Sequence, residues 1–411
     1  MAEYSSDELV APDWLDASFF QKVVREFNKD TSIVVKNIAT RPGTKPGEHY
    51  ASVMYRTEVT FDCAASKNNV IKLILKTMPF EEGHKKQFLQ ETTAFKTEMR
   101  MYGEVLPEMQ RLLRSINDQT VIAPTLVYKS NEPAPVIVFI DEGPNGFKPY
   151  ESALTHAQAQ VVIDRIAKFH ACSVKMNENG IDMASFNDCP FEKVEGRMDF
   201  MEFFTPNIRD ALKTIKKWKG VDDVIPVLEK HVEVLEERVR ELYLNRSDRR
   251  YEVLTHGDFQ FKNMISRNGG LKSEDYLLLD YQFCYWCTPA PDVLALLYNI
   301  CHEEVRLEHR EETIRKYFTI FTETLQKLQF KGKMPRLIDL QLEILRCGIL
   351  EYMNFLIFVP FLQIDFSKLD LNEMVEKMDF HSAGKFVFES EKFQRTFLER
   401  IRFLINMGVF D

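Results

Sequence analysis

The sequence has 411 residues, with 53 Lys and Arg against 62 Asp and Glu, so its formal net charge is −9. Hydrophobic residues make up 45% and aromatic residues 12% of it, which supplies enough apolar surface for a folded core and excludes a largely disordered chain. The acidic balance argues against a protein whose main task is to hold nucleic acid, because phosphate binding needs an excess of Lys and Arg.

The first half of the chain predicts one helix followed by strands. Apolar residues recur near one helical face from Pro12 to Phe27, which predicts a short leading helix. The segments Ala51 to Phe61 and Asn69 to Met78 alternate or run apolar with β-branched residues, which is typical of strands. We expect these two strands to form an antiparallel hairpin.

A long helix is predicted next, from Lys85 to Leu106, with Pro107 just past its end. A further strand from Pro135 to Ile140 leads into a segment rich in glycine and proline, DEGPNGF. We place the boundary between two lobes there. Residues 1–142 are expected to form a small lobe with an antiparallel sheet, and residues 143–411 a mainly helical lobe.

The second lobe begins with a predicted helix from His156 to Met176, followed by a second from Val224 to Tyr243. The basic cluster Lys213 to Lys219 is interpreted as a solvated surface rather than a binding patch. From Glu303 to the end the pattern is helical. The apolar stretch Ile349 to Phe366 is interrupted by charged, amide and proline residues, so it predicts a buried helix and no membrane span.

The N-terminal segment and the cysteines indicate the compartment. The chain starts with acidic residues where a secretory signal needs a basic start and an apolar run, so we expect a cytoplasmic protein. Seven cysteines, an odd number, fit reduced thiols. Cys284 and Cys287 form a CxxC, but no second ligand pair accompanies them, which favours packing over zinc or redox chemistry.

The most informative stretch lies between Tyr251 and Tyr298. Two short apolar segments, Glu252 to Thr255 and Tyr276 to Leu279, each end in a loop that carries an Asp, which predicts a hairpin-like frame. In HGDFQFKN, Asp258 precedes Asn263 by five positions, and Asp280 ends LLLD. Phosphoryl transfer from ATP needs a carboxylate to accept a hydroxyl proton and oxygen ligands to hold magnesium. The alternative is that both acids cap turns.

Upstream residues supply the partners of these acids. Lys76 lies among apolar neighbours in a predicted strand, where a lysine is expected to have a buried purpose, and Glu98 on the following helix can pair with it. Lys72 is the alternative lysine, and Glu91 and Glu104 are the alternative acids. Glu98 is preferred because it shares a helical side with Phe95, Met99 and Tyr102.

A turn ahead of the first hairpin strand contains Gly43, Gly47 and Ser52, whose backbone amides could cover phosphates. Taken alone this signal is weak, and without the downstream motifs an ordinary Gly/Pro loop is the favoured reading. The turn lacks GK[ST], which excludes a Walker-type loop, and no GxGxxG indicates a dinucleotide fold.

Together these motifs resemble the aminoglycoside phosphotransferase and choline kinase group, whose pattern is HGDxxxxN, a strand ending in Asp, and a second Asp as in PAPD. Within that group the chain is most similar to the ecdysteroid kinase-like (CHK kinase-like) family, through GEHYASVMYR, ILKTMP, FKTEMRMY, IAKFHA, HGDFQFKNM and LLLDYQ. The resemblance covers about nine-tenths of the chain. It implies an α+β, protein kinase-like bilobal fold with ATP between the lobes.

The resemblance also implies roles for individual residues. Asp258 would be the catalytic base, Asn263 and Asp280 the Mg²⁺ ligands, and Lys76 the phosphate-binding lysine with Glu98 as its partner. His256 and Asp292 would be structural. The nucleotide would be contacted by Gly47 and Ser52 in the glycine turn, and by Val138, Ile140 and Asp141 in the adenine hinge.

These roles predict a kinase that transfers the γ-phosphate of ATP to a hydroxyl of a small molecule, such as an ecdysteroid, another sterol-like alcohol or a foreign alcohol. The alternative is a catalytically silent protein that binds nucleotide or a hydrophobic ligand. An apolar acceptor pocket is one reading of a set of aromatic residues, and a core is the other: Phe200, Phe203, Phe204, Tyr352, Phe355 and Phe358.

The chain departs from many family members at Gln260, Lys262 and Ile140, where Trp, Asn and an acid are common. None of the three supplies the base or a metal ligand, so the departures bear on substrate choice. Lys262 adjoins Asn263 and could contact a phosphate or an acceptor, or simply face solvent. A protein-kinase assignment is disfavoured, because the twelve positions between Asp280 and Asp292 leave no room for an activation loop.

Overall fold

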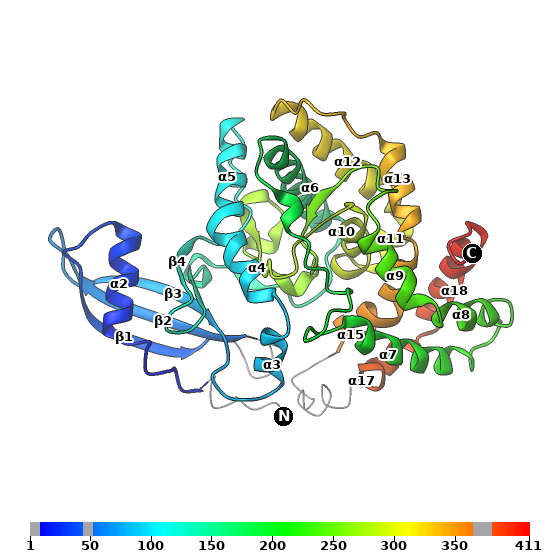
Figure 1. Ribbon diagram of the computed structural model, residues 1–411, viewed down its shortest axis with the longest axis horizontal. Helices are drawn as coiled ribbons and strands as arrows, with labels where there is room; N and C mark the ends of the chain where they lie inside the picture. The colour runs from blue at the N-terminus through cyan, green and yellow to red at the C-terminus, as the bar shows by residue number, and fades with distance from the viewer. Residues whose placement is uncertain (1–8, 44–51, 365–379) are drawn as a thin grey trace.

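The computed structural model describes residues 9–43, 52–364 and 380–411. Within them, one end of the molecule is an antiparallel sheet of five strands in the order β1-β2-β3-β5-β4, with α2 on one face (Figure 1). The other end is mainly helical. The predicted α+β architecture of a small sheet lobe and a large helical lobe is confirmed. The elements of the small end are α2 (Ala17–Asn28), β1 (Val34–Pro42), β2 (Val53–Asp62), β3 (Asn69–Thr77), β4 (Leu126–Ser130) and β5 (Val136–Ile140).

The hairpin predicted from residue alternation is present. β2 and β3 pair antiparallel, with Met54 opposite Lys76. Alternate residues of β2 are buried, because one face of the strand packs on a small core shared with α2. The leading helix starts at Ala17 rather than Pro12, since the Asp16 carboxylate accepts the Phe19 N–H and caps it. β1 was not predicted, because this edge strand exposes most of its residues.

The prediction of one long helix from Lys85 to Leu106 is wrong in two respects: the segment is not one continuous helix, and its last part continues to Ser115. It is divided into α3 (His84–Gln90), α4 (Ala94–Arg100) and α5 (Leu106–Ser115), and Met101–Val105 forms a π-helical turn. Pro107 lies in the first turn of α5 instead of beyond the helix. The Leu106 N–H bonds to the carbonyl of Met101, five residues back, and this wider turn accommodates a proline that cannot donate a hydrogen bond.

The large lobe is organised around α6, which packs along α12, and one extensive apolar core. Its helices are α6 (His156–Glu178), α7 (Phe200–Ile215), α8 (Ile225–Val232), α9 (Leu235–Leu244), α10 (Ala290–Ala295), α11 (Glu303–Glu308), α12 (Arg310–Lys327), α13 (Leu337–Arg346), α14 (Ile349–Met353), α15 (Val359–Leu362), α17 (Phe380–Phe388) and α18 (Glu391–Asn406). Residues of α4 and α5 also belong to this core. The division of the chain near residue 142 stays a prediction.

The predicted single helix from Val224 to Tyr243 is interrupted at Glu233 and Val234, between α8 and α9. Leu228, Val232, Leu235 and Val239 keep their spacing across the break, because both pieces pack on the same core. Apolar periodicity therefore could not reveal it.

The hairpin-like frame predicted around the catalytic stretch is also wrong. β7 (Val253–Thr255) pairs with β10 (Tyr285–Cys287), whereas β9 (Tyr276–Leu278) pairs with β8 (Met264–Ser266), which in turn pairs with β6 (Lys148–Pro149). The turn at residues 268–270 joins β8 to β9. The two Asp-bearing loops are nevertheless adjacent, because the Leu279 N–H donates to the Asn263 carbonyl at 2.9 Å.

Other expectations concern burial. Cys284 and Cys287 are free and buried, as packing requires. The lysines of the 213–219 cluster are exposed. The described part of the stretch predicted as a buried helix, Ile349 to Ile364, is largely buried. In the described residues, no single helix is long and apolar enough to cross a membrane, and only the bent pair Leu337–Arg346 and Ile349–Leu362 reaches that length and apolarity together.

Candidate active site

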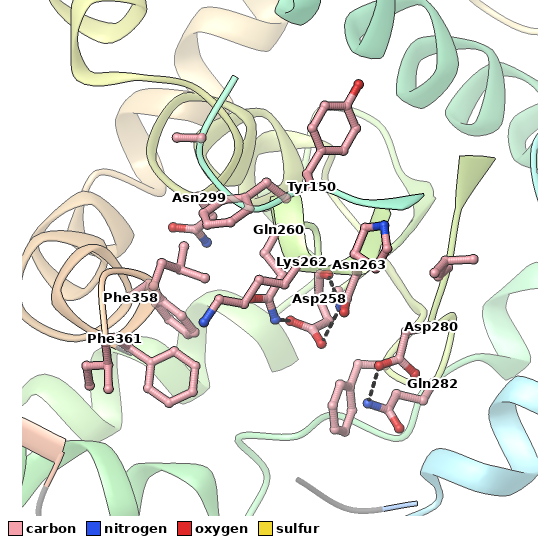
Figure 2. A pocket seen from close by; sticks show the side chains of 18 of the residues that line it. Tyr150, Asp258, Gln260, Lys262, Asn263, Asp280, Gln282, Asn299, Phe358 and Phe361 are labelled. Carbon is pink, nitrogen blue, oxygen red and sulfur yellow. Dashed lines mark hydrogen bonds between the residues drawn. The ribbon is translucent and has the colours of Figure 1, made fainter. Parts of the chain in front are cut away.

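Asp258 lies in the loop that leaves β7. Its carboxylate accepts two hydrogen bonds, from the Gln260 side chain at 2.7 Å and from the Asn263 side chain at 2.8 Å (Figure 2). The pKa of Asp258 is raised to about 6, because burial and the charge of Asp280 raise it by more than the two amide donors and Lys76 lower it. A carboxyl with such a pKa is ionised at neutral pH yet basic enough to take a proton.

Asp280 follows β9 and points into the same space. Its backbone has a φ of 64°, in the left-handed region that few residues other than glycine adopt. One carboxylate oxygen accepts from Lys76 Nζ at 2.6 Å, and the other accepts from the Gln282 side chain at 3.1 Å. Strain of this kind is typical of functional positions, because the surrounding structure must hold the residue there.

Lys76 projects from β3 and bridges two acids. Its Nζ lies 2.6 Å from Glu98 Oε2 on α4 and 2.6 Å from Asp280 Oδ1. Burial lowers the pKa of Lys76, but the two carboxylates outweigh this and leave that pKa raised. The pairing predicted between Lys76 and Glu98 is present. Of the alternatives, Lys72 pairs with Glu58 on the surface.

The two remaining alternative acids are also accounted for. Glu104 is exposed and lies 3.8 Å from Arg100. Glu91 accepts a hydrogen bond from Gln87. The side chain of Glu98 is only 2% exposed, and burial raises its pKa while the Lys76 ammonium lowers it.

A network of buried hydrogen bonds holds the backbone just before Asp258. Asp292 on α10 accepts the backbone N–H of His256 at 2.6 Å and that of Gly257 at 3.3 Å. Its Oδ2 also lies 3.0 Å from His170 Nε2 on α6. His256 reaches the carbonyl of Leu279, which joins the two Asp-bearing loops. Burial lowers the pKa of His256.

Only some of the residues predicted to contact the nucleotide line the cavity that contains Asp258. Ser52, Ile140 and Asp141 line the same cavity as Asp258, whereas Val138 packs in the core of the small lobe. Val138 and Ile140 are two positions apart on β5 and both belong to the small-lobe cluster, but only Ile140, at the end of the strand, also borders the cavity. The nucleotide contact of Val138 stays a prediction. Gly47 lies outside the described residues. Gly43 lines the cavity, with its N–H bonded to the Met54 carbonyl.

The cavity has a volume of about 2490 Å³ as the described residues line it. Lys76, Asp258 and Asp280 all line it, and Figure 2 shows Asp258 and Asp280 close to each other. On the large-lobe side its wall is aromatic, with Phe200, Phe203, Phe204, Phe358 and Phe361. Tyr352 and Phe355 do not line it and are fully buried core residues. Of the six aromatic residues singled out in the sequence, four therefore line the cavity, and Tyr352 and Phe355 belong to the core.

Lys262 extends from the catalytic loop toward the aromatic wall, where Figure 2 shows it near Phe358 and Phe361. Its Nζ lies 5.8 Å from the centre of the Phe361 ring. The Lys262 side chain is half-buried and lines the cavity. This position favours a contact with an acceptor over a side chain that simply faces solvent.

Asn263 and Asp280 offer the kind of donor set that suits a hard divalent cation. The Asn263 amide nitrogen is used for hydrogen bonds to the Asp258 carbonyl and carboxylate, so its side-chain oxygen faces away from Asp258. Asp280 adds a carboxylate. Carboxylate and amide oxygens are ligands that Mg²⁺ accepts, so the residues present fit this ion.

Sequence reasoning missed several residues of this site. His170 was quoted within IAKFHA without a role, and its contact with Asp292 crosses 122 positions of sequence. Gln282 holds Asp280, and Arg56 lies 3.4 Å from Asp141. Only the Gln two positions after Asp280 had a local signal, in LLLDYQ.

The chain is similar to known proteins in both sequence and structure. Residues 46–330 match the model of the ecdysteroid kinase-like family. The comparison with curated proteins gave no match. Among solved structures, an ethanolamine kinase of Plasmodium vivax is 12% identical, with 95% of this chain and 92% of that chain covered and a TM-score of 0.42.

Two further solved structures are similar at the same level. The GDP complex of wild-type aminoglycoside 2'-phosphotransferase-IIIa is 14% identical, covers 93% of this chain and 99% of its own, and has a TM-score of 0.38. A microcompartment-associated aminopropanol kinase is 12% identical, covers 91% and 97%, and has a TM-score of 0.39.

Proposed function

Because the chain belongs to the ecdysteroid kinase-like family, we propose that it transfers the γ-phosphate of ATP to a hydroxyl group of a small molecule. One observation carries the proposal. Lys76, Asp258 and Asp280, which lie up to 204 positions apart in sequence, meet in one cavity. The pKa of Asp258 is raised to about 6, which suits a group that takes up a proton during a reaction. A silent nucleotide-binding protein would have no need for such a group.

In this proposal Asp258 is the catalytic base. Its carboxylate accepts the proton of the acceptor hydroxyl while the acceptor oxygen forms a bond to the γ-phosphorus. The bond from that phosphorus to the bridging oxygen breaks, and ADP leaves. Gln260 and Asn263 hold the carboxylate through hydrogen bonds, so that its orientation is set before the acceptor binds.

Lys76, Asn263 and Asp280 would hold the nucleotide. Mg²⁺ bound by Asn263 and Asp280 would neutralise charge on the triphosphate. Lys76 would contact the α- and β-phosphates, with Glu98 fixing its position. Ser52, Ile140 and Asp141 would border the nucleotide from the small lobe, and the chain division near residue 142 would follow the adenine hinge.

The aromatic wall supports an acceptor with an apolar body. Phe200, Phe203, Phe204 and Phe358 offer several ring faces that suit an ecdysteroid, another sterol-like alcohol or a foreign alcohol. Phosphorylation of such an alcohol adds charge to an apolar compound, which fits a reaction that inactivates it.

The test is phosphate transfer from Mg²⁺-ATP to a panel of steroid and plant alcohols, followed by mass spectrometry of the product. We expect Asp258→Asn to lower turnover by about a thousandfold, because general-base catalysis is lost while the carboxyl's shape is kept. The exposed Asp222→Asn is the matched control and should retain full activity. Chelation of Mg²⁺ should also stop transfer.

The opposite outcome would favour the silent alternative. If the wild-type protein binds ATP but phosphorylates no acceptor in the panel or in a tissue extract, the kinase proposal fails.

A further inference from the structure

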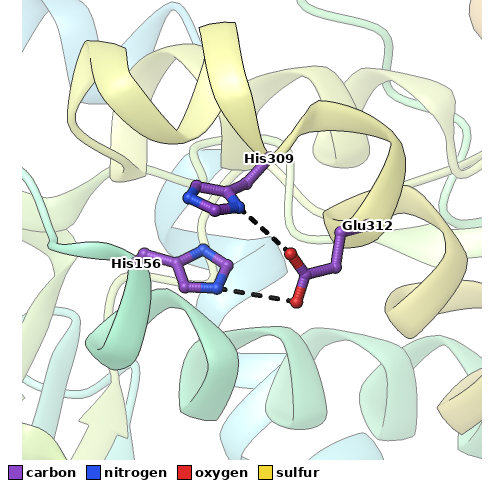
Figure 3. A group of neighbouring side chains, drawn as sticks. All are labelled: His156, His309 and Glu312. Carbon is purple, nitrogen blue, oxygen red and sulfur yellow. Dashed lines mark hydrogen bonds and ion pairs between the residues drawn. The ribbon is translucent and has the colours of Figure 1, made fainter.

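A second group of titratable side chains lies on the large lobe, where α6, α11 and α12 meet. His156 is the first residue of α6, His309 lies between α11 and α12, and Glu312 is in the first turn of α12. Figure 3 shows the two imidazole rings stacked, with both directed at the same carboxylate. None of the three residues takes part in the phosphate-transfer chemistry proposed above.

The distances within this group match those between the ligands of one metal ion. Glu312 Oε1 lies 3.6 Å from His156 Nε2, and Glu312 Oε2 lies 3.1 Å from His309 Nδ1. The three residues each offer one ligand atom, and these atoms lie within 4.8 Å of one another. In a tetrahedral zinc site with bonds of roughly 2.0 to 2.1 Å, ligand atoms are about 3.4 Å apart.

The backbone holds the three side chains in place. The segment before α6 is tied to the segment before α11, because the Leu154 N–H donates to the Ile300 carbonyl at 2.7 Å and the His302 N–H donates to the Leu154 carbonyl at 2.8 Å. Thr155 then starts α6 through a capping box with Gln158. The ligands therefore come from three elements whose positions are already fixed, which reduces the entropy lost on binding an ion.

The two imidazole rings lie against each other, with ring centres 3.9 Å apart and an angle of 29° between the planes. The stacking keeps a nitrogen of each ring close to the carboxylate of Glu312. Glu304 and Glu308 add negative charge beside His309 and form a second group with it.

The helix ends oppose a cation only weakly. The N-termini of α6 and α12 each contribute a partial charge of about +0.5, whereas Glu304, Glu308 and Glu312 contribute three full negative charges.

We propose that His156, His309 and Glu312 bind a divalent transition-metal ion of the zinc class, with water or a neighbouring Glu as the fourth ligand. Imidazole nitrogens select zinc over Mg²⁺, which prefers oxygen ligands, so this site is chemically different from the one assigned to Asn263 and Asp280. The ion would fasten the start of α6 to the junction of α11 and α12.

The test is calorimetric titration of the untagged full chain with Zn²⁺, in an excess of Mg²⁺ that saturates oxygen sites. We expect one Zn²⁺ per chain, and binding at least tenfold weaker in His309→Asn and in Glu312→Gln. The matched controls are His302→Asn and Glu311→Gln, which change an exposed His and an exposed Glu beside the group and should leave the affinity unchanged.

Thermal unfolding provides a second readout. Zn²⁺ should raise the unfolding midpoint of the wild type and of both controls but not of the two cluster variants, and circular dichroism without metal should show all five proteins folded. The proposal is overturned if no saturable Zn²⁺ binding occurs in excess Mg²⁺, or if the cluster variants bind and are stabilised like the wild type. Neither result depends on kinase activity, so this proposal and the proposed function fail separately.

Discussion

Asp258 is balanced between effects that favour its neutral form and effects that favour its ionised form. Burial and the nearby Asp280 raise its pKa, whereas hydrogen bonds from Asn263 and Gln260 lower it. Gln260 is one of the positions singled out in the sequence as a departure from the family pattern. The presence of Gln260 therefore affects the pKa of the base as well as the choice of acceptor. The sequence alone indicated only an effect on substrate choice.

A pH dependence follows for phosphate transfer. The base must be ionised, and its pKa is about 6, so kcat/KM should be constant at neutral pH and fall as the pH drops through about 6. Gln260→Leu removes a donor that stabilises the carboxylate, so the midpoint of this fall should move to higher pH. The measurement is kcat/KM between about pH 5 and pH 8 for both proteins.

Gln282→Leu serves as the comparison variant, because Gln282 donates to Asp280 and makes no hydrogen bond to the base. A midpoint that stays in place in Gln260→Leu would contradict the assignment of the profile to Asp258.

Individual site residues were predictable where one local signal was strong. A lysine in an apolar strand indicated Lys76, and helical spacing singled out Glu98 from its neighbours. His170 had no such signal, because its partner Asp292 lies far along the chain and only the fold joins them. Val138 is buried in the small core and does not line the cavity, which the predicted hinge segment could not show, because burial of one strand residue depends on what packs on the sheet.

At the level of elements, the catalytic loop depends on a close backbone approach. Gly257 precedes Asp258, has a φ of 79°, and packs so that a Cβ atom would overlap the carbonyl oxygen of Phe283. Phe283 belongs to the segment that follows Asp280. The same contact therefore sets the position of both Asp-bearing loops relative to each other.

Gly257→Ala should lower turnover by at least a hundredfold, because displacement of the loop by about 1 Å moves the base away from the acceptor hydroxyl. Gly180→Ala is the matched control: its φ is 89°, but nothing lies within 4 Å of the added Cβ. Both variants bear the cost of a side chain at positive φ, roughly 1 to 2 kcal/mol. Steady-state turnover and urea unfolding of both variants separate the two effects.

Equal losses of activity in the two glycine variants would show that general destabilisation, and not loop position, explains the effect.

Most elements could be predicted in kind, and their breaks and pairings could not. Alternation or continuous apolar runs identified β2, β3 and β5, and apolar spacing identified α6 over nearly its full length. The interruption at Glu233 leaves the apolar spacing intact, and the π-helical turn before Pro107 keeps the chain helical, so neither alters the pattern in sequence. The pairing of β7 with β10 rather than β9 depends on tertiary contacts that short strands do not encode.

At the scale of the whole molecule, Lys76 joins two bodies with separate cores. Its strand, β3, contributes to the core of the small lobe through Leu73 and Leu75. Glu98 stands on α4, beside Phe95 and Met99 of the large core, and Asp280 follows a strand of that core. The ammonium of Lys76 therefore reaches out of the small sheet to two carboxylates that lie beside the large core.

This arrangement predicts an unequal response to charge removal. Lys76→Met leaves Glu98 buried without its partner, so we expect a loss of about 3 kcal/mol in the free energy of unfolding. Without Lys76, Glu98 must take up a proton to stay buried, and adding Glu98→Gln removes this cost, so it should recover at least half of that loss, while phosphate transfer stays absent in both variants. Urea unfolding at neutral pH measures the first effect, and the transfer assay measures the second.

Lys72→Met provides the scale for this comparison, because Lys72 lies on the same strand and pairs with Glu58 at the surface, where the loss should be at most about 1 kcal/mol. If the double variant is no more stable than Lys76→Met alone, the destabilisation comes from lost packing of the lysine chain and not from an unpaired acid. The electrostatic connection between the small sheet and the large core would then have to rest on Asp280 alone, whose side chain is 26% exposed and better solvated than Glu98.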